Sequence, residues 1–85
     1  MANALDAEFA RTAMMGGMAE IQMSQLALRR STNREIQQYA RRMIADHTKN
    51  GSELQKIAAR KQISLPTALS PEMQQMMQPL MDASG

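Results

Sequence analysis

One histidine and a few carboxylates are the first candidates for chemistry in this chain. His47 is the only histidine, and helical spacing places it on an apolar face rather than a wet one. In an antiparallel helix pair, Glu20 lies about one helical turn from His47, with Asp46 or Glu53 nearby. Two readings follow: a metal or proton site built from Glu20 and His47 with Asp46 or Glu53 nearby, or a buried hydrogen-bonded pair that fixes the helix register. The shortage of further ligands favours the second.

Known enzyme templates are missing from the sequence. Di-iron sites in helical bundles take a Glu-x-x-His motif from each of two helices and one further glutamate from each of the others. Ile44 occupies the position three residues before His47, so that motif is absent. There is also no cysteine, nucleophile elbow, phosphate-binding loop or His-Glu-x-x-His motif. We therefore expect a non-enzymatic protein with no bound cofactor.

Methionine is the most overused residue, at 10 positions. Thioethers bind Cu(I), and helical spacings of three and four between methionines could chelate it. Met at such spacings also fills irregular cores and forms adaptable partner-binding surfaces without any metal. The packing reading accounts for most of the pattern, and transition-metal binding is the alternative. The methionines concerned are Met73, Met76, Met77 and Met81.

Five arginines cluster around the Ser31–Asn33 segment and form a basic end. Such a patch could bind anionic lipid head groups or nucleic acid, or it could be a solvated surface. The net charge is only +2, and Phe9 and Tyr39 are the only aromatic residues, which leaves no base-stacking platform. We therefore expect a solvated face and no nucleic-acid partner. The patch comprises Arg29, Arg30, Arg34, Arg41 and Arg42.

Apolar periodicity predicts an all-α chain that consists of an antiparallel helical hairpin and a short third helix. The first helix should start near Asp6 and span about 6–30, and the second should span about 33–61. Thr32 and Glu35 have the spacing of a capping box at the start of the second helix. Residues 62–70 form a linker, and Ser70-Pro71 starts a third helix over about 71–81, interrupted by Pro79.

The first helix carries a wide apolar stripe, which we expect to be its core face. Gly16 and Gly17 interrupt this helix at a cost, so another group should approach the backbone there, and the missing side chains leave room for the His47 imidazole. The apolar positions of the third helix, predicted to pack together, are Met73, Met76, Met77 and Leu80. The stripe of the first helix comprises Leu5, Phe9, Ala13, Gly16, Glu20, Met23 and Ala27.

The length of 85 residues suits one small domain whose core benefits from a partner chain. No apolar run approaches the roughly 20 residues that a membrane span needs, so we expect no transmembrane segment. The N-terminal residues have no basic region followed by an apolar run, which argues against a signal peptide in this chain. We expect the periplasm or cell envelope if a signal sequence was removed, and otherwise the cytoplasm.

Several of these residues together resemble a bacterial family, domain of unknown function 4142. The most specific part is the segment 40–47, Ala-Arg-Arg-Met-Ile-Ala-Asp-His, placed one helix after Glu20. The resemblance covers about residues 5–66, and weakly beyond. The other residues that carry it are Phe9, Ala13, Gly16, Gly17, Ala19, Leu26, Ala27, Ser31, Tyr39, Leu54, Ala58, Leu65 and Pro66.

The resemblance implies a ferritin-like four-helix domain, usually exported, with no established activity. Such domains are normally longer than this chain, so we expect residues 1–85 to be a single short domain or a fragment of a longer one. In either case, pairing two hairpins as a homodimer would complete a four-helix bundle. The function expected is a non-enzymatic structural or interaction module of a cell-envelope protein, with a protein partner as a further option. The alternative is a metal-binding protein that uses Glu20 and His47 or the methionines.

Overall fold

A computed structural model describes residues 3–83 of the chain. The described residues form three helices and no strands: α1 (Ala4–Arg30), α2 (Arg34–Lys61) and α3 (Pro71–Asp82). The all-α prediction is therefore confirmed, and each predicted helix lies within two residues of its observed bounds. No helix between residues 3 and 83 is long and apolar enough to cross a membrane.

The N-terminus of α1 differs from the sequence prediction. Asn3, rather than Asp6, is the N-cap, and its side-chain oxygen accepts a hydrogen bond from the Asp6 backbone N–H at 2.8 Å. This bond satisfies one of the backbone N–H groups that a helix leaves unpaired at its start. Asp6 instead places negative charge in the first turn, where the helix dipole favours it.

The N-terminus of α2 also uses a different cap from the one predicted. Asn33 is the N-cap, and its side-chain oxygen accepts from the Ile36 backbone N–H at 3.0 Å, so Thr32 does not form the expected capping box with Glu35. Gln37 reaches back and donates to the Ser31 carbonyl at 2.6 Å, which ties the turn to the helix. The helix continues through Gly51 and ends at Lys61, followed by the C-cap Gln62, whose φ of 58° is left-handed.

The start of α3 follows the sequence prediction, but its interior does not. The Ser70 hydroxyl accepts from the Met73 N–H at 3.2 Å, with Pro71 in the first turn. Pro79 was expected to interrupt this helix, yet helical structure runs past it to Asp82. Pro79 lies in the last turn of α3. Its missing N–H therefore removes a hydrogen bond near the end of the helix rather than in its middle.

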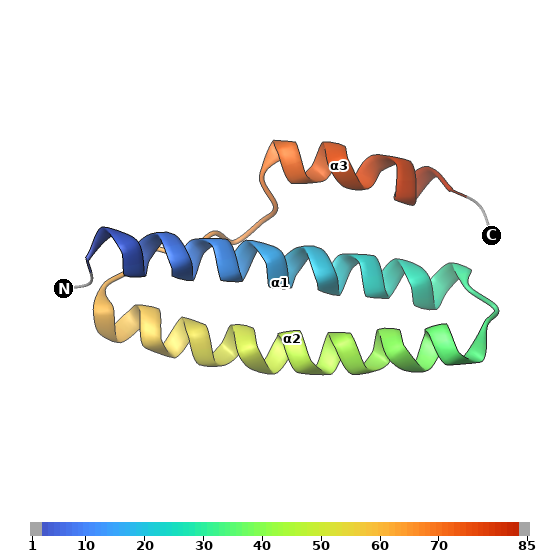
Figure 1. Ribbon diagram of the computed structural model, residues 1–85, viewed down its shortest axis with the longest axis horizontal. Coiled ribbons are helices and arrows are strands. Elements are labelled where there is room, and N and C mark those ends of the chain that lie inside the picture. The colour runs from blue at the N-terminus through green and yellow to red at the C-terminus, as the bar shows by residue number, and fades with distance from the viewer. Residues whose placement is uncertain (1–2, 84–85) are drawn as a thin grey trace.

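The three helices lie side by side in one layer with α1 in the middle (Figure 1). α2 runs antiparallel to α1 along its whole length, whereas α3 lies against the other side of α1. Within the described residues α3 touches α1 but not α2. The layer measures 46 × 25 × 16 Å and has a radius of gyration of 14.6 Å. A compact domain of this length would have a radius of about 12 Å, so the fold is open.

A small apolar cluster and two arginines hold α3 and its linker on α1. Ala19 of α1, Leu69 and Met77 are buried together, and Met15, Met18 and Met73 pack around them. Arg30 donates to the carbonyls of Leu80 and Ala83 at the end of α3, where the helix dipole also favours a positive charge. Arg11 donates from Nε to the Ser64 carbonyl in the linker at 3.1 Å.

Part of the stripe predicted as the core face of α1 is uncovered. Leu5 is 76% and Phe9 70% exposed, and Ala13 and Gly16 are exposed as well. Within this chain these residues are not part of a core, because α2 and α3 contact the other sides of α1, and their cover by a second hairpin stays a prediction. The prediction for α3 is partly wrong in the same way, since Met73 and Met77 pack on α1 but Met76 is 72% and Leu80 45% exposed.

Candidate functional site

A hollow of about 610 Å³ lies between α1 and α2. Two glycines open it. A Cβ added at Gly17 would lie 3.7 Å from His47 Nδ1, and one added at Gly51 would lie 3.9 Å from Met14 Sδ. These two pairs also fix the register of the hairpin, because each glycine faces the paired residue across the helix interface. Met14, Met18, Ile21, Leu54 and Ile57 give the hollow an apolar lining.

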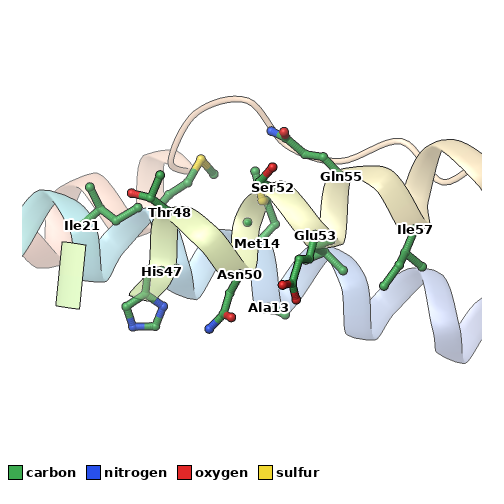
Figure 2. Close-up of a pocket in the computed structure, with 14 residues that line it drawn as sticks. Ala13, Met14, Ile21, His47, Thr48, Asn50, Ser52, Glu53, Gln55 and Ile57 are labelled. Atoms are coloured by element: carbon green, nitrogen blue, oxygen red, sulfur yellow. The ribbon is translucent and has the colours of Figure 1, made fainter. Parts of the chain in front are cut away.

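His47 lies where the sequence placed it, on the side of α2 that faces α1, and it is half-buried. The imidazole lies opposite Gly17, but a Cβ added there would fit at 3.7 Å from Nδ1, so the imidazole does not depend on the missing side chain; nothing lies within 4 Å of a Cβ at Gly16. Figure 2 shows the imidazole, Asn50 and Glu53 on one side of α2, and Thr48, Ser52 and Gln55 on the other.

Within residues 3–83 the carboxylates of the candidate site do not form a three-ligand group with His47. Glu20 is half-buried on α1, and Asp46 is exposed on α2. Glu53 lines the same hollow as His47, but Glu20 and Asp46 do not line it. Within residues 3–83 no three His, Asp or Glu side chains lie close enough together to hold a metal ion. This chain by itself therefore does not provide a three-ligand metal centre in the described part.

The methionines of α3 separate into packed and exposed side chains. Met73 and Met77 pack against α1, which is the packing reading of the sequence. Met76 is 72% exposed and Met81 46% exposed, and Met81 lines a second, small hollow with Arg29. Met73 and Met77 are thus held in packing contacts with α1, whereas Met76 and Met81 are largely exposed.

The predicted basic patch is only partly a free surface. Arg29, Arg34, Arg41 and Arg42 are exposed, as expected for a solvated face. Arg30 is instead engaged by the carbonyls at the C-terminal end of α3. Sequence reasoning missed this role, because nothing along the chain indicates that residues 30 and 80 meet.

The most extensive candidate surface is the side of the α1–α2 pair that faces away from the 62–70 segment. Figure 2 shows Ala13, Asn50 and Ile57 on this side. Phe9 lies one turn from Ala13, and Tyr39 lies 18 residues from Ile57, which is five full turns, so both belong to the same side. We call this surface the open face. Its large exposed apolar side chains are Leu5, Phe9, Met23, Ile36, Tyr39 and Ile57.

Comparison with known families gives a single assignment over the whole chain. The family model described as Domain of unknown function (DUF4142) matches residues 1–85. The chain belongs to this family. None of the curated proteins and none of the solved structures matches the DUF4142 chain significantly.

Membership of the DUF4142 family confirms the resemblance drawn from the segment 40–47. The family description assigns no activity, so the function of this DUF4142 domain has to be argued from its own surfaces. Of those surfaces, the open face holds the largest set of apolar side chains that the fold leaves uncovered.

Proposed function

We propose that this DUF4142 domain is a non-enzymatic helical interaction module that pairs with a second copy through the open face. The pair would form a four-helix bundle with a ferritin-like arrangement of two hairpins. An isologous dimer uses the same surface of both copies, so a single apolar face is enough to build it. A different helical protein with an apolar face could use the same surface.

The observation that carries this proposal is the uncovered apolar surface of the hairpin. The accessible surface is 6396 Å², whereas a compact monomer of 9.5 kDa exposes about 5,000 Å². The excess is larger than the roughly 800 Å² that one subunit contributes to a standard protein interface. Burying that area would remove Phe9 and Tyr39, which are 70% and 59% exposed, from water.

Two variants with similar exposure test the proposal. Phe9 on the open face is 70% exposed, and Met76 on α3 is 72% exposed. We expect the wild type and Met76→Ser to have the mass of a dimer in sedimentation equilibrium at micromolar concentration, and Phe9→Ser to have that of a monomer. A wild type that stays monomeric and well folded up to millimolar concentration would contradict the homodimer.

Transition-metal binding is the competing proposal. Its one support is that His47 and Glu53 line the same hollow, and a second copy would have to supply the other ligands. Elemental analysis after incubation with Fe(II), Cu(I) and Zn(II), for the wild type and His47→Gln, separates the two functions. Metal near one equivalent that disappears in His47→Gln would favour metal binding, whereas an interaction module retains none in either protein.

The compartment is also part of the proposal. We place the domain in the periplasm or cell envelope, on the strength of the family resemblance. Fusion of the natural gene to a reporter that is active only after export tests this placement, and a reporter active only in the cytoplasm would contradict it.

A further inference from the structure

We propose that the open face is built to pair with itself about a two-fold axis that runs across both helices at the level of Gly16 and Thr48. In this arrangement α1 lies antiparallel on α1 of the second copy, and α2 lies antiparallel on α2. The inference rests on the proposed function, because it states how the second copy sits on the open face.

The apolar residues of α1 are arranged symmetrically about Gly16. Phe9 lies seven residues before it and Met23 seven residues after it, on the same side of the helix. A two-fold axis at Gly16 places Phe9 against Met23 of the second copy, twice. Thioether sulfur and aromatic rings make favourable contacts. Both side chains are exposed in the single chain, at 70% and 39%.

The apolar residues of α2 are arranged symmetrically about Thr48 in the same way. Tyr39 lies nine residues before Thr48 and Ile57 nine residues after it, so an axis at that level places Tyr39 against Ile57 of the second copy. Both are exposed, at 59% and 43%. Two helices therefore show the same kind of symmetry independently.

The two symmetry centres lie at the same height in the hairpin. Gly17 faces His47 across the helix interface. Gly16 on α1 and Thr48 on α2 each lie one residue farther from the turn that joins the two helices. One axis can therefore pass both centres. A hairpin whose two centres were displaced by several residues could not use a single two-fold axis.

Charges along the outer edge of α2 follow the same axis. The exposed charged residues with helical spacing along this edge include Glu35, Arg42, Asp46, Lys49, Glu53 and Arg60. To within one residue, rotation about the level of Thr48 places Glu35 against Arg60 of the second copy. With the same tolerance, it also places Arg42 against Glu53, and Asp46 against Lys49. Each of these charges then meets the opposite sign, which is the complementarity that fixes the register of an interface.

Gly16 allows the two α1 helices to approach closely at the axis. A Cβ at this position would meet nothing within 4 Å in the single chain, so the glycine backbone lies bare on the open face. Close backbone approach at the crossing point then brings the larger residues on either side into contact.

Cysteine cross-linking tests the position of the axis, because the chain has no cysteine of its own. In the proposed dimer, Cys in Gly16→Cys meets its own copy and forms a disulfide-linked dimer on mild oxidation. Cys in Met23→Cys lies about 21 Å from its own copy along the antiparallel helices and stays free. Thr48→Cys is the matched control, since it lies at the same level but on the opposite side of α2.

Exchanging the charges of Arg42 and Glu53 independently tests how the two α2 helices are aligned, and it leaves the residues at the two-fold axis unchanged. Arg42→Glu alone and Glu53→Arg alone should each weaken dimerisation about ten-fold, because each creates two like-charge contacts. The double variant should recover most of the wild-type affinity. Within one chain these residues are 11 positions apart, about 16 Å along α2, so recovery reports a contact between copies.

The outcomes separate this inference from the proposed function. Preferential cross-linking at position 16 with recovery in the charge-exchanged variant supports the two-fold arrangement. A dimer that cross-links better at position 23, or in which the two charge effects simply add, overturns the arrangement and leaves the interaction module standing. A chain that does not self-associate at millimolar concentration overturns both.

Discussion

At the scale of single residues, the two adjacent glycines of α1 have different surroundings. A Cβ at Gly17 would make an ordinary contact with His47 Nδ1 at 3.7 Å, whereas a Cβ at Gly16 would meet nothing within 4 Å. Both glycines lie inside a 27-residue helix, where glycine costs about 0.5 to 1 kcal/mol relative to alanine. Their replacement by alanine therefore gains helix stability in either case.

The matched pair Gly17→Ala and Gly16→Ala separates these surroundings. We expect Gly17→Ala to raise the free energy of unfolding by about 0.5 to 1 kcal/mol at every protein concentration. Gly16→Ala should give the same gain in dilute solution and a smaller one where the protein is dimeric, since its methyl group enters the helix crossing. Urea unfolding at two protein concentrations measures both, and equal gains for the two variants throughout would argue against Gly16 at the interface.

At this scale the sequence predicted the position of His47 but not the surroundings of the candidate site. Spacing placed His47 opposite the glycines of α1, and the structure puts it opposite Gly17. Spacing could not show that Glu20, Asp46 and His47 fail to gather into a three-ligand group, because side-chain direction and reach decide that. It also could not pair Arg30 with carbonyls 50 or more residues away.

At the scale of the elements, helix starts depend on which of several suitable residues adopts the capping geometry. Ser31, Thr32 and Asn33 are all good N-caps, so the sequence predicts the position of the turn but not which of the three residues caps the helix. In the structure Asn33 accepts the Ile36 N–H, and the Ser31 hydroxyl accepts the Asn33 N–H at 3.1 Å. The second bond orients Asn33, which explains why Thr32 is left outside the helix.

Alanine substitutions distinguish these two caps. Asn33→Ala should lower the free energy of unfolding by about 1 kcal/mol, because the Ile36 N–H loses its partner. Thr32→Ala should change it by less than about 0.5 kcal/mol, as for most exposed substitutions. Chemical denaturation followed by circular dichroism measures both, and a larger loss for Thr32→Ala would restore the capping box read from the sequence.

The attachment of α3 is the weakest link between elements. Its contacts reach α1 alone, through the cluster of Ala19, Leu69 and Met77 and the hydrogen bonds of Arg30. Arg30→Gln should release the end of α3 from α1 while α1 and α2 stay folded, because the charged donor at the α3 C-terminus is lost. Amide hydrogen exchange should then speed up in α3 by about ten-fold and remain unchanged in α2.

Arg29→Gln is the control for that experiment. Arg29 belongs to the same last turn of α1, but the carbonyls of Leu80 and Ala83 accept their bonds from Arg30. Equally faster amide exchange of α3 in Arg30→Gln and Arg29→Gln would mean that positive charge at the end of α1, rather than the hydrogen bonds of Arg30, holds α3 in place.

At the scale of the whole molecule, the sequence predicted three helices, their order and the apolar stripe of α1, and the second hairpin expected to cover that stripe stays a prediction. Helical periodicity reports that one side of a helix is apolar, and it does not say whether the same chain or another covers it. The fold answers half of this question. α2 and α3 lie on two sides of α1, and Leu5 and Phe9 remain on the third.

Thermal unfolding across a range of concentrations tests whether a second copy provides that cover. A dimer that unfolds to separated chains becomes more stable as concentration rises, so its unfolding midpoint should increase by about 4 °C for each ten-fold rise. Tyr39→Ser removes a side chain of the open face that is 59% exposed, and it should abolish the dependence of the midpoint on concentration. Leu80→Ser changes a side chain of α3 that is 45% exposed, and it should keep that dependence. A midpoint independent of concentration in the wild type would contradict the homodimer, because a pair that buries so large an apolar surface must gain stability as concentration rises.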